Sequence, residues 1–149
     1  MNFGFDCING VKVPQMVVEE DHILCNEHHG TVHVVNGTLT IKGELYGTLD
    51  VQPYSTAIIL GEQHGTVSVA NNAKVIVFGE LQGTTAVSSD GMVIVEENGK
   101  LAGTLNNNGT VIVRGVFGGA RSGFGEMVLE GSGYIKQPVT RNGINYYEW

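Results

Sequence analysis

The stretch from Gly43 to Val95 consists of three rows with the same layout. The rows are GELYGTLDVQPYSTAIIL (residues 43–60), GEQHGTVSVANNAKVIVF (61–78) and GELQGTTAVSSDGMVIV (79–95). Their opening residues Gly43, Gly61 and Gly79 are 18 positions apart (61 − 43 = 18 and 79 − 61 = 18). A period of this length is too short for a helical-hairpin repeat and is typical of one coil of a β-solenoid.

Less regular rows continue the pattern on both sides. They are NEHHGTVHVVNGTLTIK (26–42), GKLAGTLNNNGTVIVR (99–114) and GVFGGARSGFGEMVLE (115–130), and the third central row extends to residue 98. Unequal rows are expected when insertions are confined to the corners of a natural solenoid. The sequence therefore predicts about six coils over residues 26–130.

Aligning the rows shows which positions face the interior. The third, seventh and ninth positions are mostly Leu or Val, and the fifth is glycine in all six rows, at residues 30, 47, 65, 83, 103 and 119. With period-two alternation these odd positions should point inward. We expect the glycines to mark a place where the wall bends or where the interior is too narrow for a side chain. Nearly continuous apolar runs such as 75–77 and 110–113 predict a second, parallel-paired strand in each coil.

The two ends depart from the repeat and read as caps on a single domain of residues 1–149. Residues 1–25 contain short strand patterns and an Asn9-Gly10 turn, and residues 131–149 contain an Asn142-Gly143 hairpin signal. A solenoid needs such caps because its open ends expose unpaired backbone. The second cap carries four large aromatic residues suited to plugging the last coil: Tyr134, Tyr146, Tyr147 and Trp149.

The hand of the solenoid is a choice between two architectures. A left-handed hexapeptide helix also uses coils of about 18 residues, and Leu45, Val51 and Ala57 do recur every six positions. However, the small residue that should follow such positions is instead Tyr46 or Ile58. We therefore predict an all-β fold, a single-stranded right-handed parallel β-helix (β-solenoid) capped at both ends.

The charge and composition of the chain limit the classes of partner that it is expected to bind. The formal charge is −7 with only eight Lys and Arg residues, which do not cluster, so we expect no nucleic-acid partner and favour a basic protein. No apolar run is long enough to span a membrane, and the first residues lack the pattern of a signal peptide. The expected location is cytoplasmic, with Cys7 and Cys25 reduced; a single Cys7–Cys25 bridge is the alternative.

Two outward columns form the candidate site. Glutamates at the second position and polar or aromatic residues at the fourth should face solvent, in a protein-binding set of Glu27, Glu44, Glu62, Glu80, His29, Tyr46 and His64. Coils about 4.8 Å apart would align the carboxylates in a stripe, at a repulsion of about 0.9 kcal/mol per neighbouring pair in water. The stripe is interpreted as a docking surface for a basic protein, with a solvated corner that discourages lateral aggregation as the alternative.

The sequence carries no established catalytic motif, so we expect a protein that is not an enzyme and uses no cofactor. GxSxG, HExxH, P-loop and Rossmann patterns are all missing. A hexapeptide-type acyltransferase with His29, His33 or His64 as its base is an alternative. The spacing of Cys25 and His28 would suit zinc, but His29 and His33 should point away from His28, so no metal site is predicted.

The segments GELYGTLDV, GEQHGTVSV, GELQGTTAV and GKLAGTL resemble the repeats of bactofilins, bacterial cytoskeletal proteins. The resemblance covers about the middle two-thirds of the chain and implies a right-handed β-helix that self-assembles through its coils into homo-oligomers. The resemblance does not extend to the ends: bactofilins are similar in their coils but have uncapped ends with flexible tails, whereas both ends of this chain carry aromatic residues. The small size, the acidity and the missing catalytic motifs favour an acidic inhibitor or immunity protein that neutralises a basic toxin such as a nuclease. The resemblance implies the alternative, a bactofilin-like scaffold.

Overall fold

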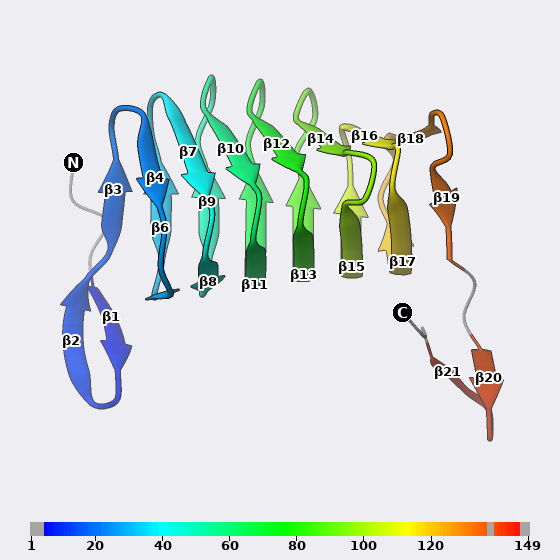
Figure 1. Ribbon diagram of the computed structural model, residues 1–149, viewed down its shortest axis with the longest axis horizontal. Coiled ribbons are helices and arrows are strands. Elements are labelled where there is room, and N and C mark those ends of the chain that lie inside the picture. Colours follow the sequence, from blue (N-terminus) through cyan, green and yellow to red (C-terminus); the bar gives the residue numbers. More distant parts are fainter. Residues whose placement is uncertain (1–4, 137–138, 147–149) are drawn as a thin grey trace.

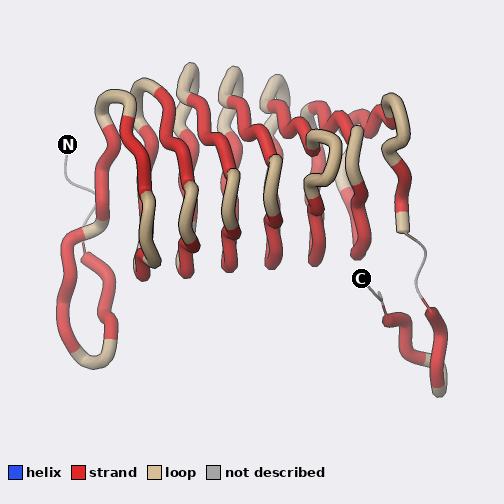
Figure 2. The backbone as a smooth tube through the Cα atoms, viewed as in Figure 1, coloured by secondary structure: helices blue, strands red, loops and turns tan. Residues whose placement is uncertain are grey.

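Two parallel β-sheets run along the whole length of the molecule (Figure 1). The computed structural model describes residues 5–136 and 139–146, which form 21 strands. None of these residues belongs to a helix long and apolar enough to span a bilayer. Figure 2 shows strands and loops alternating along a coiled tube, as the 18-residue rows predict.

One sheet has seven strands, one from each coil. In spatial order they are β4 (His22–Leu24), β7 (Thr38–Ile41), β10 (Thr56–Ile59), β12 (Lys74–Val77), β14 (Met92–Val95), β16 (Thr110–Val113) and β18 (Glu126–Leu129). Every neighbouring pair is parallel, and the register places equivalent residues of successive coils side by side. The β-solenoid prediction is confirmed, with about seven coils where the rows indicated about six.

The other sheet has ten strands. Its main path comprises β3 (Met16–Val18), β6 (Val32–Val34), β9 (Leu49–Val51), β11 (Glu62–Val69), β13 (Glu80–Val87), β15 (Lys100–Asn107), β17 (Val116–Ser122) and β19 (Tyr134–Ile135). The short strands β5 (His28–His29) and β8 (Glu44–Tyr46) pair with each other, and β8 also pairs with β11. Strands β11, β13 and β15 thus span in one piece what the earlier coils divide into two strands.

The additional coil lies at the N-terminal end, where β3 and β4 pair in parallel with β6 and β7. The stack therefore begins at Met16 rather than at residue 26. Residues 16–24 lack the glycine of the repeat, but Met16, Val18 and Leu24 still pack against the core. At this end β1 (Phe5–Ile8) and β2 (Val11–Pro14) stand outside the coils, as an antiparallel hairpin.

The C-terminal end also extends the coils further than the rows indicated. Strand β19 pairs in parallel with β17, and an antiparallel hairpin of β20 (Val139–Arg141) and β21 (Ile144–Tyr146) follows. The predicted Asn142-Gly143 turn is present, with both residues at positive φ. Tyr134 was expected to plug the last coil, but it is 53% exposed because it stands on the outer side of β19. The side chains of Tyr146, Tyr147 and Trp149 lie outside the described residues.

The core is a continuous column of aliphatic side chains inside the coils. The inward residues of successive strands are fully buried, as the alternation predicted; examples are Leu45, Leu81 and Leu101 on one side and Leu39, Ala57 and Val75 on the other. Burying one Val or Leu side chain stabilises a fold by about 1.5–3 kcal/mol. Repeating this burial in every coil is what holds a narrow solenoid together.

The glycine column forms a single file, with Gly65 paired to Gly83 and Gly103 to Gly119. These glycines lie at a bend of the wall, because Gln63 and Val67 on either side of Gly65 are both buried while Gly65 itself is exposed. A Cβ on Gly83 would lie 2.2 Å from the carbonyl oxygen of Gly65 in the preceding coil. The bend was predicted correctly. The narrow-interior explanation was wrong, because the space is taken by the neighbouring backbone.

Candidate functional site: a ladder of carboxylates and rings

The seven candidate residues lie together on one outward face. Strand pairing places Glu62 beside both Glu44 and Glu80, and places Tyr46 beside both His29 and His64. Glu27 directly precedes β5 and lies in the same file as the other carboxylates. We call this surface the ladder face and define it as Glu27, Glu44, Glu62, Glu80, His29, Tyr46, His64 and Gln82.

The three rings of the ladder face stack on one another. The ring centroids of His29 and Tyr46 are 5.0 Å apart with planes inclined by 13°, and those of Tyr46 and His64 are 4.7 Å apart at 6°. The coil spacing produces this geometry, because equivalent residues of parallel in-register strands stand about 4.8 Å apart. The repeat predicted the three rings in one column, but the stacking that such a column implies was not predicted. Stacking holds the rings in fixed positions.

Each carboxylate of the ladder face has a partner two residues further along its own strand. His29 interacts with Glu27, and the Tyr46 hydroxyl donates to Glu44. Residues i and i+2 of a strand point to the same side, so a donor in the fourth position reaches a glutamate in the second. Glu27, Glu44 and Glu80 are therefore hydrogen-bonded rather than bare repelling charges, whereas Glu62 makes a longer ion-pair contact with His64.

The other two glutamates, Glu62 and Glu80, have partners in the same arrangement, and the file of carboxylates ends at a basic residue. The nearest atoms of His64 and Glu62 are 3.6 Å apart, whereas Gln82 Nε2 donates to Glu80 at 2.9 Å. Lys100 in the next coil stands in the second position and forms an ion pair with Glu80 at 3.6 Å. This change from glutamate to lysine closes the acidic file.

The phenol of Tyr46 is held in its protonated form. The hydrogen bond that it donates to Glu44, followed by burial and the charges of Glu44, Glu27 and Glu62, raises the pKa of Tyr46 to about 12. Ionising the phenol would break that hydrogen bond and add another negative charge to the file. Tyr46 therefore acts as a neutral donor at the centre of the ring stack.

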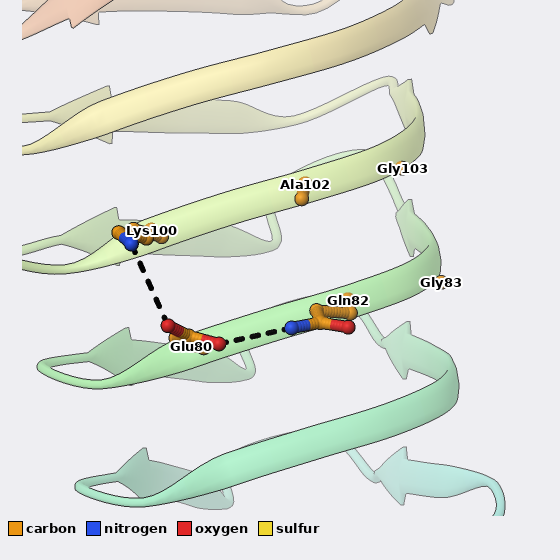
Figure 3. A pocket seen from close by; sticks show the side chains of 6 residues that line it. All are labelled: Glu80, Gln82, Gly83, Lys100, Ala102 and Gly103. Carbon is orange, nitrogen blue, oxygen red and sulfur yellow. Dashed lines mark hydrogen bonds and ion pairs between the residues drawn. The ribbon is translucent and has the colours of Figure 1, made fainter. Parts of the chain in front are cut away.

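A shallow hollow lies where the ladder ends (Figure 3). Its wall contains Glu80 and Gln82 from β13, Lys100 and Ala102 from β15, and the bend glycines of both coils. Ala102 stands in the fourth position, where the preceding coils carry a ring or an amide. The small side chain leaves the space above Gln82 open.

His33 stands on the neighbouring outward surface and joins the N-terminal hairpin to the coils. Its ring nitrogens lie 2.7 Å from a carboxylate oxygen of Asp50 and 2.7 Å from the amide oxygen of Gln15. Gln15 in turn donates to Asp6, and Asp6 accepts a 2.6 Å hydrogen bond from the backbone N–H of Thr31. Both ring nitrogens of His33 are thus engaged in a structural network, which weakens the case for His33 as a general base.

Asp6 accepts hydrogen bonds from Thr31 at the point where the preceding coil begins, at Met16. Strand β3 of the preceding coil bonds Thr31 at its carbonyl oxygen, which accepts from the Met16 N–H at 3.0 Å. The N–H and the hydroxyl of Thr31 instead donate to the Asp6 carboxylate. The backbone hydrogen bond is the main reason why the pKa of Asp6 is lowered, and burial opposes it. The hairpin therefore caps backbone that would otherwise be unpaired.

The geometry of the described residues does not support the zinc site or the disulfide that were considered as alternatives. In the ranges 5–136 and 139–146, no three side chains among His, Cys, Asp and Glu come together as a metal site. Cys7 and Cys25 are free and exposed thiols, so the alternative bridge is not formed. His28 lies partly inside the wall, where burial is the main cause that lowers its pKa.

Comparisons with known proteins leave the site to be interpreted from its own chemistry. No family model, no curated protein and no solved structure matches the chain. The bactofilin resemblance therefore rests on the repeat pattern and on the β-solenoid fold alone.

Proposed function

We propose that the protein is a non-catalytic binding module whose ladder face docks a basic protein, most concretely a toxin such as a nuclease that it neutralises. The observation that carries this proposal is the in-register file of four carboxylates beside three stacked rings. Such a face offers several acceptors at fixed spacing on rigid backbone. Rigid, preorganised contacts lose little conformational entropy when a partner binds.

The ladder face combines the two kinds of contact that protein interfaces favour. Tyrosine is enriched at interface hot spots, and a stacked ring provides a flat apolar contact. Glu27, Glu44 and Glu62 each have a second carboxylate oxygen for a lysine or arginine of the partner, whereas Gln82 and Lys100 engage the two oxygens of Glu80. The side chains of Glu27, Glu62 and Glu80 remain 58%, 37% and 34% exposed. Charge-assisted hydrogen bonds to such oxygens are about twice as strong as neutral ones.

The net charge supports the same class of partner. A formal charge of −7 attracts basic proteins over distances beyond the contact surface and raises their association rate, an effect that salt screens. An acidic surface that covers the basic substrate groove of a nuclease would neutralise it. A narrow acidic face without a catalytic motif suits that task.

A charge-reversal pair tests the proposal. The double variant Glu44→Lys/Glu62→Lys is titrated by calorimetry against a panel of purified basic ribonucleases and deoxyribonucleases, beside wild type. The matched control is Glu20→Lys/Glu97→Lys, which makes the same change in net charge at exposed corners outside the ladder face. We expect the ladder variant to lose affinity by at least about tenfold per reversed contact that is buried, and the control to change only the salt-dependent association rate.

Two results would count against the proposal. Unchanged affinity and salt dependence in Glu44→Lys/Glu62→Lys would show that the ladder face is not the interface. A panel in which no nuclease is bound or inhibited by wild type would remove nuclease neutralisation as the function.

A second candidate is a self-assembling scaffold in the manner of bactofilins. It is favoured by the two outer strands of the seven-stranded sheet, since β4 and β18 each pair on one side only among the described strands. Unpaired edges of this kind can continue a sheet into another copy. Light scattering over a range of concentrations separates the candidates, because end-to-end assembly gives filaments that lengthen with concentration.

A further inference from the structure

The outward side of the seven-stranded sheet carries an unbroken apolar file. Ile58, Ile76, Ile94 and Ile112 are paired in register across β10, β12, β14 and β16. Their neighbours in the strands, such as Ala57 and Ile59, fill the core, so the isoleucines themselves face outward and stay partly exposed. The file is defined here as the apolar strip, together with Leu60 and Phe78, which are 43% and 46% exposed at the adjoining corner.

An apolar strip of this kind needs a partner. The outer side of a sheet that faces water normally alternates to polar residues, and a contiguous exposed apolar patch marks an interaction surface. Beside the strip one arginine serves two carboxylates, because Arg114 binds Glu96 at 2.6 Å and Glu130 at 2.9 Å, so this cluster keeps one negative charge in excess. An apolar centre with a polar rim is the usual anatomy of a protein interface.

We propose that the apolar strip binds a second copy of this chain, sheet against sheet, with the long axes of the two solenoids antiparallel. The two-fold axis runs along the strand direction and passes between Ile76 and Ile94. This axis places Ile76 of one copy opposite Ile94 of the other, and Ile58 opposite Ile112. An isologous contact requires a surface that is complementary to itself after such a rotation. The four equivalent isoleucines at equal spacing satisfy that requirement. At the adjoining corner the rotation places Leu60 and Phe78 opposite the side chains of Arg114 and Glu96 of the other copy, so the isoleucine file is the self-complementary part.

The residues just beyond the strip fit the same axis in shape. In β7 the file continues as Thr40, where a shallow hollow opens between Ile23 and Thr38. In β18 it continues as Val128, which is 38% exposed. The two-fold axis places Val128 of one copy over the hollow at Thr40 of the other. The hollow of one end thus receives the protruding side chain of the opposite end.

The rim residues fit the axis in charge. Lys42 follows β7 and Glu130 follows β18, each two residues beyond the position that continues the file. The rotation brings Lys42 of one copy opposite Glu130 of the other, and it does so twice in each dimer. A parallel arrangement would lack this pairing, so charge complementarity favours the antiparallel dimer. The ladder face belongs to the other sheet and remains accessible.

Sedimentation equilibrium of the full chain across a wide concentration range tests the proposal. We expect wild type to form a closed dimer and Ile76→Thr/Ile94→Thr to be monomeric at the same concentrations, since threonine keeps the strand but removes the apolar contact. Ser68→Thr/Ala86→Thr, at outward positions of the other sheet, is the matched control and should remain dimeric. Circular dichroism verifies that all variants are folded.

A charge swap tests the register. Lys42→Glu should weaken the dimer about tenfold, because two rim pairs become repulsive. Glu130→Lys alone should also weaken it, and the double variant should dimerise more tightly than either single variant; the comparison with Glu130→Lys accounts for the Arg114 ion pair that this change removes within the chain. A monomeric wild type at all concentrations, a dimer that survives Ile76→Thr/Ile94→Thr, or open filaments would overturn the proposal. A double variant that dimerises no more tightly than the two single variants would equally overturn the antiparallel contact.

Discussion

At Gly83 two independent restraints act on the same position. Its φ of +97° lies in the region that residues with a Cβ rarely adopt, and a Cβ there would lie 2.2 Å from the Gly65 carbonyl oxygen. Strained backbone conformations cost about 1–3 kcal/mol each. We expect Gly83→Ala to lower the free energy of unfolding by at least about 2 kcal/mol, measured by urea denaturation.

Gly131→Ala is the matched control for Gly83→Ala. Gly131 also has a positive φ, of +57°, but no atom lies within 4 Å of the position of its Cβ. Its substitution should cost about 1 kcal/mol, the conformational part alone. Equal losses in the two variants would show that the neighbouring carbonyl moves aside and that the close approach of the coils is not restrictive.

Asp6 should make the stability of the N-terminal coil depend on pH. Its folded pKa lies below the ordinary value of 3.8 because the carboxylate accepts the Thr31 N–H. The stabilisation is therefore fully present above that value and is lost as the pH falls through the folded pKa. We expect Asp6→Asn to be less stable than wild type near neutral pH, and the difference to shrink in acid, as measured by urea unfolding at a series of pH values.

Asp90→Asn provides the control, because Asp90 lies at an exposed corner where Asn also tolerates the positive φ. Its difference from wild type should vary less over the same range. If the difference between wild type and Asp6→Asn stays constant down to the lowest pH, the carboxylate does not stabilise the fold through its charge.

Among the elements, β13 contains a polar residue where its neighbours are apolar. Thr85 is fully buried between Val67 and Leu105, and its hydroxyl has no hydrogen-bond partner among the described residues. An unsatisfied buried polar group costs about 1–3 kcal/mol. We expect Thr85→Val to raise the free energy of unfolding by about 1 kcal/mol, since valine has the same shape without the hydroxyl.

The adjacent Thr84 supplies a control in the same strand. It is exposed, so Thr84→Val removes no buried polar group and should change stability by less than about 0.5 kcal/mol. A destabilised Thr85→Val variant would indicate that the hydroxyl is satisfied within the core.

The strands also show how far sequence reasoning reached. The alternation in rows 43–95 predicted the inward residues and the shared face of Glu44, Glu62 and His64, because both follow from a fixed period. The coil at Met16 was missed because its apolar residues lack the bend glycine. The apolar strip was hidden because TVIV and KVIV are apolar on both faces, so the pattern does not distinguish inward valine from outward isoleucine.

Contacts between the N-terminal hairpin and the coils could not be predicted from the repeat pattern of the sequence. The hydrogen bond from Thr31 to Asp6 joins residues 25 positions apart, and no period relates the hairpin to the coils. The partners of Glu44 and Glu80 within their own strands could have been predicted, since a donor two residues away lies on the same side. The handedness remains a prediction from the sequence.

On the scale of the whole molecule, each coil pairs only with its neighbours. The central strands β11, β12, β13 and β14 are paired on both sides, whereas β4 and β18 are paired on one side. Stability in such a stack is a sum of local terms, so the ends should open more readily than the middle. We expect amide hydrogen exchange, followed by NMR, to be slowest in β11–β14 and to become faster toward both ends.

The contrast between β12 and β4 decides this prediction. Both are strands of the seven-stranded sheet, and they differ in how many neighbours they have. Equal protection in β12 and β4 would mean that the solenoid unfolds only as one unit. Measuring exchange at low protein concentration separates this effect from any protection that a second copy would add.

The equal length of the central rows has an evolutionary consequence. Because residues 61–78 and 79–96 occupy interchangeable positions in the wall, an in-frame tandem duplication of one row in the gene would be accommodated without rearranging either terminus. Each such duplication would lengthen the acidic face and the isoleucine file by the same increment. Natural variants of different size could thus arise in single steps, with the reach of both surfaces changing together.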